Sequence, residues 1–120
     1  MTKMEDILVA DDVYDGLATD RLRELLESGT TPERARATGA LARRAARDDS
    51  LRPEVLEVLM GPDLRGMRLM GISIAHIGVA CLYGAAPTAL KSEVKALVDA
   101  WPEPDRSDLL WFLRSQGLTL

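Results

Sequence analysis

The chain has 120 residues, a net charge of −4 and 47% hydrophobic residues, although aromatic residues make up only 4%. These figures fit one compact domain, leave no length for a second, and argue against a general polyanion-binding protein. The 19 Leu and 15 Ala outnumber the 7 Val and 4 Ile. Because Leu and Ala favour helices whereas β-branched residues favour strands, we expect an all-α fold.

The first predicted element is an acidic arm over residues 1–16, extended or helical, and residues 17–120 are expected to form a single all-α domain. Helical spacing of apolar residues, bounded by Pro and Gly, predicts about six helices. They cover residues 17–28, 32–48, 53–60, 64–83, 88–101 and 105–117. Short connections favour antiparallel neighbours, so the helices should pair in sequence order.

Glycines stand where four of these helices should end. Gly29, Gly61, Gly84 and Gly117 each follow or close an apolar periodic segment. Glycine accepts a left-handed C-terminal conformation without strain, and the four positions are therefore expected to be helix C-caps.

The segment from Leu69 to Leu90 contains no Asp, Glu, Lys or Arg. Its length would suit a membrane-spanning helix, but Ser73, His76, Pro87 and three glycines interrupt it. We therefore expect a central helix packed on every side and no membrane association. Without a recognisable secretory signal at the start, the expected location is the cytoplasm.

Two segments share an outline. Leu25–Arg36 leads into Ala40–Ala42, and Val58–Arg65 leads into Ile72–Ala75; in each, a Leu-rich helix ends at Gly and a Pro-acid pair opens the next helix. Over about residues 18–84 this order resembles HEAT or armadillo-type helical repeats. The resemblance implies a small stack of helix pairs that binds a protein partner, with open ends that favour homo-oligomers.

Arginines cluster in the predicted helix 32–48. Arg36, Arg43 and Arg47 fall within about 40° of one another on a helical projection, with Arg44 beside them. One interpretation is a face that is solvated or paired within the chain, to acids of the arm or to Glu54 and Glu57. The other is a site for an acidic protein surface or, as an alternative function, for nucleic acid, although few aromatic residues are present for base stacking.

The arm supplies the opposite charge. Residues 1–20 carry a net charge of −5, and residues 31–52 carry +3. Asp11, Asp12 and Asp15 are candidate partner-binding residues, and they would suit an acidic inhibitor or immunity-type protein that binds a basic partner. Function therefore depends on whether the arm and the arginines satisfy each other or an external partner.

Trp111 and Phe112 are adjacent in the last predicted helix. Neighbouring helical positions point about 100° apart, so one ring can be buried while the other faces outward. The exposed one would be an anchor for a partner protein, although burial in an outer packing layer is the interpretation that we favour.

Catalytic and metal-binding patterns are weak. His76 and Cys81 lie about 140° apart on one helix, and both are expected to be core residues. Ser73 can reach His76, but no orienting acid lies near in sequence. A single Cys beside a single His cannot form a zinc site of the Cys/His kind. We therefore expect a non-enzymatic protein-interaction or regulatory module without a cofactor.

Overall fold

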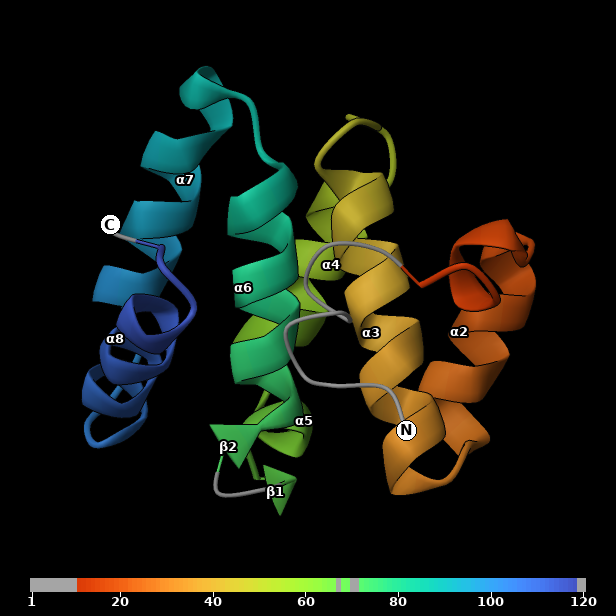
Figure 1. Ribbon diagram of the computed structural model, residues 1–120, viewed down its shortest axis with the longest axis horizontal. Helices are drawn as coiled ribbons and strands as arrows, with labels where there is room; N and C mark the ends of the chain where they lie inside the picture. The colour runs from red at the N-terminus through yellow and green to blue at the C-terminus, as the bar shows by residue number, and fades with distance from the viewer. Residues whose placement is uncertain (1–10, 67, 70–71, 119–120) are drawn as a thin grey trace.

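The computed structural model describes residues 11–66, 68–69 and 72–118, which form an all-α domain with one very short hairpin (Figure 1). The elements, in chain order, are η1 (Tyr14–Gly16), α2 (Thr19–Ser28), α3 (Thr31–Ala45), α4 (Arg52–Met60), α5 (Pro62–Gly66), β1 (Arg68–Leu69), β2 (Ile72–Ser73), α6 (Ile74–Ala85), α7 (Thr88–Asp99) and α8 (Asp105–Ser115). The predicted fold class is confirmed.

Helices α2 and α3 form the first antiparallel pair. Thr30 caps α3 through a capping box with Glu33, in which each side chain bonds the other residue's backbone N–H. Across the pair, Arg34 Nε donates to the Leu26 carbonyl at 2.6 Å and Arg44 Nη1 donates to Thr19 Oγ1 at 2.8 Å. Each contact joins one end of α3 to the opposite end of α2, as antiparallel packing requires.

The single helix predicted over 64–83 is wrong. The chain instead makes the five-residue α5, pairs Arg68 with Ser73 and Leu69 with Ile72 in an antiparallel hairpin, and then begins α6. Ser73 has an extended backbone and caps α6: its Oγ accepts from the His76 N–H, and its own N–H donates to His76 Nδ1. That cap satisfies the backbone groups that a continuous helix would have paired.

Helices α4 and α6 form the second pair, which lies beside the first. Corresponding helices of the two pairs run in the same direction. The middle of α3 meets the middle of α6 at Gly78, where a Cβ would lie 2.8 Å from Thr38 Cγ2 and would also overlap Leu59 Cδ2 of α4. Near their C-terminal ends, Arg43 Nη1 lies 3.5 Å from Cys81 Sγ. Helices α3 and α6 therefore run in the same direction through the core (Figure 1).

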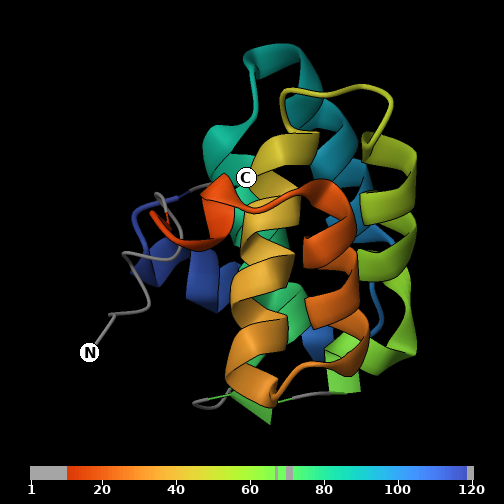
Figure 2. The ribbon, with the colours of Figure 1, turned by 90° about the vertical axis from the view of Figure 1, so that its right-hand side faces the viewer.

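Helices α2 and α4 are also parallel neighbours. Arg23 of α2 pairs with Glu54 of α4, and further along both helices Leu26 and Val58 line one hollow. Figure 2 shows α2 and α4 side by side on the surface, with α3 next to α2. The molecule thus has an inner layer, α3 and α6, and an outer layer, α2 and α4.

Helices α7 and α8 cover the side of α6 away from α3 (Figure 1). Trp101, in the connection between them, is buried and donates its indole N–H to Met60 Sδ. Gly117 directly follows Gln116, the C-cap of α8, and its φ of +78° is the left-handed conformation expected of a glycine at a helix end. Gly29 and Gly61 are the C-caps of α2 and α4, as expected, although their backbones are extended rather than left-handed. Gly84 differs from expectation, because it lies within α6.

Candidate functional site

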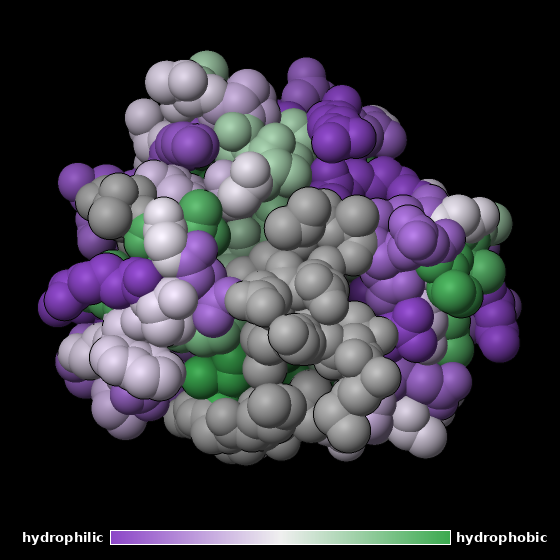
Figure 3. Space-filling model, viewed as in Figure 1, coloured by the Kyte–Doolittle hydropathy of each residue, from purple (hydrophilic) through white to green (hydrophobic). Residues whose placement is uncertain are grey.

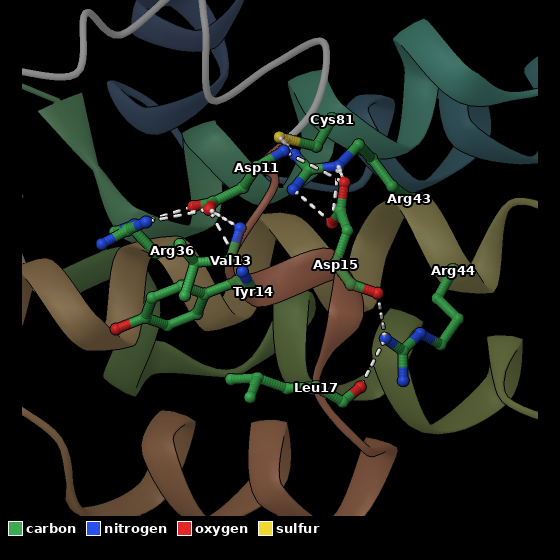
Figure 4. A network of polar contacts seen from close by, with 9 residues as sticks. All are labelled: Asp11, Val13, Tyr14, Asp15, Leu17, Arg36, Arg43, Arg44 and Cys81. Carbon is green, nitrogen blue, oxygen red and sulfur yellow. Dashed lines mark hydrogen bonds and ion pairs between the residues drawn. The ribbon is translucent and has the colours of Figure 1, made fainter.

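The described part of the acidic arm, residues 11–16, packs on the arginine face of α3 (Figure 4). Arg36 forms a two-point ion pair with Asp11, with Nε 2.7 Å from Oδ2 and Nη2 2.8 Å from Oδ1. Its guanidinium carbon also lies 4.1 Å from the centroid of the Tyr14 ring. Planar guanidinium groups suit both contacts, because they bind carboxylates through two hydrogen bonds and stack on aromatic rings.

Asp11 also shapes the arm itself. Its Oδ1 accepts the backbone N–H groups of Val13 and Tyr14, at 3.2 and 3.1 Å, which starts η1. Only 7% of the residue is exposed. The hydrogen bonds from Arg36 hold the pKa of the Asp11 carboxyl below its usual value, with a further contribution from the backbone donors and against the opposing effect of burial.

A second ion pair joins the arm to α3 through Asp15, four residues after Asp11. Arg43 Nη2 lies 2.7 Å from Asp15 Oδ1, and Asp15 Oδ2 accepts the Asp11 N–H at 3.0 Å. Arg43 is buried, and its Nη1 approaches the thiol of Cys81. Burial raises the pKa of that thiol to about 12, in spite of the nearby positive charge.

Arg44 and Arg47 differ in their surroundings. Arg44 Nη2 donates to the carbonyls of Asp15 and Leu17, at 3.0 and 2.7 Å, where the chain turns into α2. Arg47 is exposed and makes no ion pair with any residue in the described part of the chain. Asp12 is exposed as well.

Most of the charged candidates from the sequence are therefore used within the chain. Arg36 and Arg43 pair with Asp11 and Asp15, as the internal-pairing interpretation expected, and Asp11 and Arg43 are too buried to present a free charge. The suggested pairing with Glu54 is wrong, because Glu54 binds Arg23 of α2. The part of the arm over residues 1–10 lies outside the described residues.

The C-terminal aromatic pair is split, which helical geometry allows, and the favoured interpretation of burial is wrong for Trp111. Trp111 is 66% exposed and Phe112 is 3% exposed. Phe112 is therefore a core residue and is unavailable as a surface anchor. Among the described residues, Trp111 and Val13 are the large apolar side chains that remain exposed.

Ser73, His76 and Cys81 are fully buried. His76 Nδ1 accepts the Ser73 N–H, which places the ring hydrogen on Nε2, 2.9 Å from the carbonyl of Asp105. The ring also meets Trp101 edge-on, with 5.3 Å between centroids. His76 thus caps α6 and ties it to the start of α8, whereas Cys81 faces Arg43, so the two side chains have separate partners, as expected.

The sequence interpretation missed an open groove between α2, α4 and α5, with a volume of about 560 Å³. Leu26, Val58 and Leu64 form its apolar part. Its charged residues are Arg23, Arg34, Glu27, Glu54, Glu57 and Asp63. Beneath the groove, Leu26 and Val58 also line a smaller apolar recess with Leu41, Val55 and Leu59.

A signal for the groove was present in the sequence. Glu27 lies in the last turn of α2 and Glu57 in the last turn of α4, and neither turn contains a basic residue. Helix C-termini carry partial negative charge and normally attract Lys or Arg. Acids in the last turns of both α2 and α4 therefore depart from what stability alone favours.

On the face shown in Figure 3, hydrophilic residues cover much of the side over α2 and α3, and the coloured apolar residues form small separate groups. No three His, Cys, Asp or Glu residues in the described ranges are grouped so that they could hold a metal ion. No described helix has the length and apolar character needed to cross a bilayer.

Comparison with known proteins gives no relative. No family model matches the chain, and neither the curated proteins nor the solved structures contain a match. Geometry and charge alone therefore bear on the function, and the groove and Trp111 are the surface features that they single out.

Proposed function

We propose that this protein is a non-enzymatic protein–protein interaction module of a regulatory kind, and that the groove between α2, α4 and α5 is its binding surface. The groove carries the proposal, because it combines partly exposed apolar side chains with charged residues around them. Interfaces of this composition have an apolar centre and a polar rim. Trp111 on α8 offers a second, separate anchor.

The helix arrangement supports the resemblance to HEAT-type repeats. Antiparallel pairs α2–α3 and α4–α6 stand side by side with like helices parallel, which is how helical repeats stack. Thr30 and Ser73 cap the corresponding inner helices with the same capping-box geometry. Scaffolds built in this way commonly bind partners along a surface shared by successive pairs.

A nucleic-acid function is less favoured. Arg36 and Arg43 already bind carboxylates of the arm, and a phosphate would have to displace Asp11 and Asp15 to reach them. The single, buried Cys81 fits the cytoplasmic setting that we include in the proposal.

Site-specific photo-crosslinking tests the proposal. A photoreactive amino acid replaces Glu27 or Glu57 in the groove, and Glu93, exposed on α7, provides the matched control. After irradiation in the cells that make the protein, both groove positions should yield the same adduct, absent from the Glu93 control.

The partner identified from the adduct is then purified, and its affinity is measured for the unmodified chain and for a Val58→Arg chain of unchanged helical content. The unmodified chain should bind the partner at least about tenfold more tightly. A groove that yields no adduct, or the adducts seen at Glu93, would remove the groove as the binding surface. Equal affinity for the Val58→Arg chain would do the same.

A further inference from the structure

We infer that the groove recognises a basic, amphipathic helical segment of a partner protein. This inference rests on the proposed function and specifies the chemistry of the partner. Apolar side chains of that segment would pack on the partly exposed Leu26 and Val58, and its Lys or Arg residues would face the surrounding acids. Helix-in-groove recognition of this kind needs no free backbone groups on the receptor.

The charge balance of the groove is negative. Its residues include four acids and two arginines. Arg23 is already engaged, with Nε 2.7 Å and Nη2 2.9 Å from the carboxylate of Glu54, and it also binds Asp20. Arg34 donates its Nε–H to the carbonyl of Leu26.

Three acids remain after this pairing. Glu27, Glu57 and Asp63 make no ion pair with any residue that the structure describes. A positively charged partner would therefore gain new ion pairs at these three positions without having to break an existing one.

The helix ends add to the negative potential. Because α2 and α4 are parallel, their C-termini lie at the same end of the groove, and each carries a partial negative charge of about half an elementary charge. Arg34 and Arg65 offset part of it, through hydrogen bonds to the carbonyls of Leu26 and Gly61. Even so, no Lys or Arg occupies the last turn of either helix.

The groove acids are sequence neighbours of its apolar residues. Each apolar groove residue has an acid beside it in sequence: Leu26 precedes Glu27, Val58 follows Glu57, and Leu64 follows Asp63. Leu26 and Val58 are half-buried, so part of their surface is open to a ligand. A complementary ligand has an apolar stripe with positive charges on both sides, which is the surface of a basic amphipathic helix.

An extended peptide fits less well. Strand addition requires an unpaired strand edge, and the strands in the described ranges are only two residues long and lie in the β1–β2 hairpin, outside the residues that line the groove. The groove walls are helices, whose backbone groups bond within each helix except for the carbonyls of the last turns. Side chains therefore provide most of the contacts, which favours a helix as the ligand.

Two synthetic peptides of about 15 residues test the inference. Both carry the same leucine stripe, and the remaining positions are mainly Lys in one and mainly Glu in the other. Fluorescence anisotropy measures their affinity for the intact chain. We expect the Lys peptide to bind at least about tenfold more tightly, and this preference should shrink as salt is raised.

A charge-reversed chain shows whether the groove is the site. Glu27→Lys, Glu57→Lys and Asp63→Lys together should invert the preference, so that the Glu peptide binds more tightly. The control chain carries Asp12→Lys, Glu93→Lys and Asp99→Lys, which change the net charge equally at exposed positions outside the groove. It should keep the preference of the unmodified chain.

Equal binding of the two peptides, binding of neither, or the same response in both variant chains would overturn the inference. These failures are distinguishable from failure of the proposed function. A groove that crosslinks a partner but does not prefer the Lys peptide is an interaction surface for a different chemistry, whereas a groove without adducts is not the binding surface.

Discussion

The carboxylate of Asp11 has two structural roles. It accepts the backbone N–H groups that open η1, and it pairs with Arg36 from α3, twenty-five residues away. Because little of Asp11 is exposed, removing the charge would leave Arg36 without its carboxylate partner and would weaken the turn at once. The anchoring of the arm therefore depends strongly on this residue.

Asp11→Asn should lower the free energy of unfolding at pH 7 by about 1–3 kcal/mol, because charge-assisted hydrogen bonds are lost. The folded-state pKa of Asp11 lies below its unfolded value of about 3.9, so its contribution is complete above that pH and is lost as the pH falls through the folded-state pKa. The difference between the two proteins should be smaller at a pH well below about 3.9 than at pH 7. Urea denaturation at both pH values measures it.

Asp12→Asn is the matched control, since Asp12 is the exposed neighbour. It should change stability by less than about 0.5 kcal/mol. Equal losses in the two variants, or a loss at Asp11 that is the same at both pH values, would show that the Asp11 ion pair does not anchor the arm.

Some residue-scale features could be predicted from sequence and others could not. Adjacent helical positions diverge by about 100°, so the sequence allowed Trp111 and Phe112 to face different surroundings without showing which ring would be exposed. The opposite charges of the arm and of α3 suggested pairing. The approach of Arg43 to Cys81 was not predictable, since it depends on how α3 and α6 pack rather than on either helix alone.

At the scale of elements, the start of α6 shows what periodicity cannot reveal. The apolar spacing from Leu64 onward suits a helix, yet Ser73 and His76 form a cap that ends any helix arriving from the N-terminal side. His76 takes the position usually held by Glu or Gln in a capping box. A pattern search for Ser-x-x-Glu therefore misses this boundary.

Helix α6 also has a position that tolerates no side chain. Gly78→Ala should cost about 1–3 kcal/mol, because the added Cβ would overlap the buried side chains of Leu59 and Thr38. Thermal unfolding followed by circular dichroism measures the effect.

Gly84→Ala in the same helix is the control. The nearest atom to its Cβ, Leu118 Cδ1, would be 4.0 Å away, and the helix propensity of Ala should make the change neutral or stabilising. A Gly78→Ala protein as stable as the Gly84→Ala protein would mean that α3, α4 and α6 are less closely packed than the structure has them.

The acids at the ends of α2 and α4 should reduce stability. Glu27→Lys and Glu57→Lys each replace an unfavourable charge near a helix C-terminus, and each should raise the free energy of unfolding by about 0.3–1 kcal/mol at low salt. Thermal unfolding at low and high salt measures the gain, which should fall with salt.

Glu93→Lys is the comparison, since Glu93 lies in the interior of α7 and away from both helix ends. It should have little effect. If Glu27→Lys and Glu57→Lys instead lower stability, the groove acids have structural partners and their retention needs no binding function.

At the scale of the whole molecule, the composition of the sequence predicts the all-α class, and the short connections predict antiparallel pairs. The way the two pairs pack side by side could not be predicted from the sequence. It depends on contacts between segments forty residues apart, such as that of Thr38 with Gly78. The groove depends on that packing as well. Its walls come from α2 and α4, which are separated in the chain by the whole of α3.

The position of α3 has a consequence for how the molecule unfolds. This Ala-rich helix is buried against α2 on one side and α6 on another, so neither helix pair can hide its apolar surface alone. Separating the pairs would expose the buried alanines of α3 and the fully buried residues of α6 at once. The two pairs should therefore open as one cooperative unit, with local opening confined to the ends of the stack.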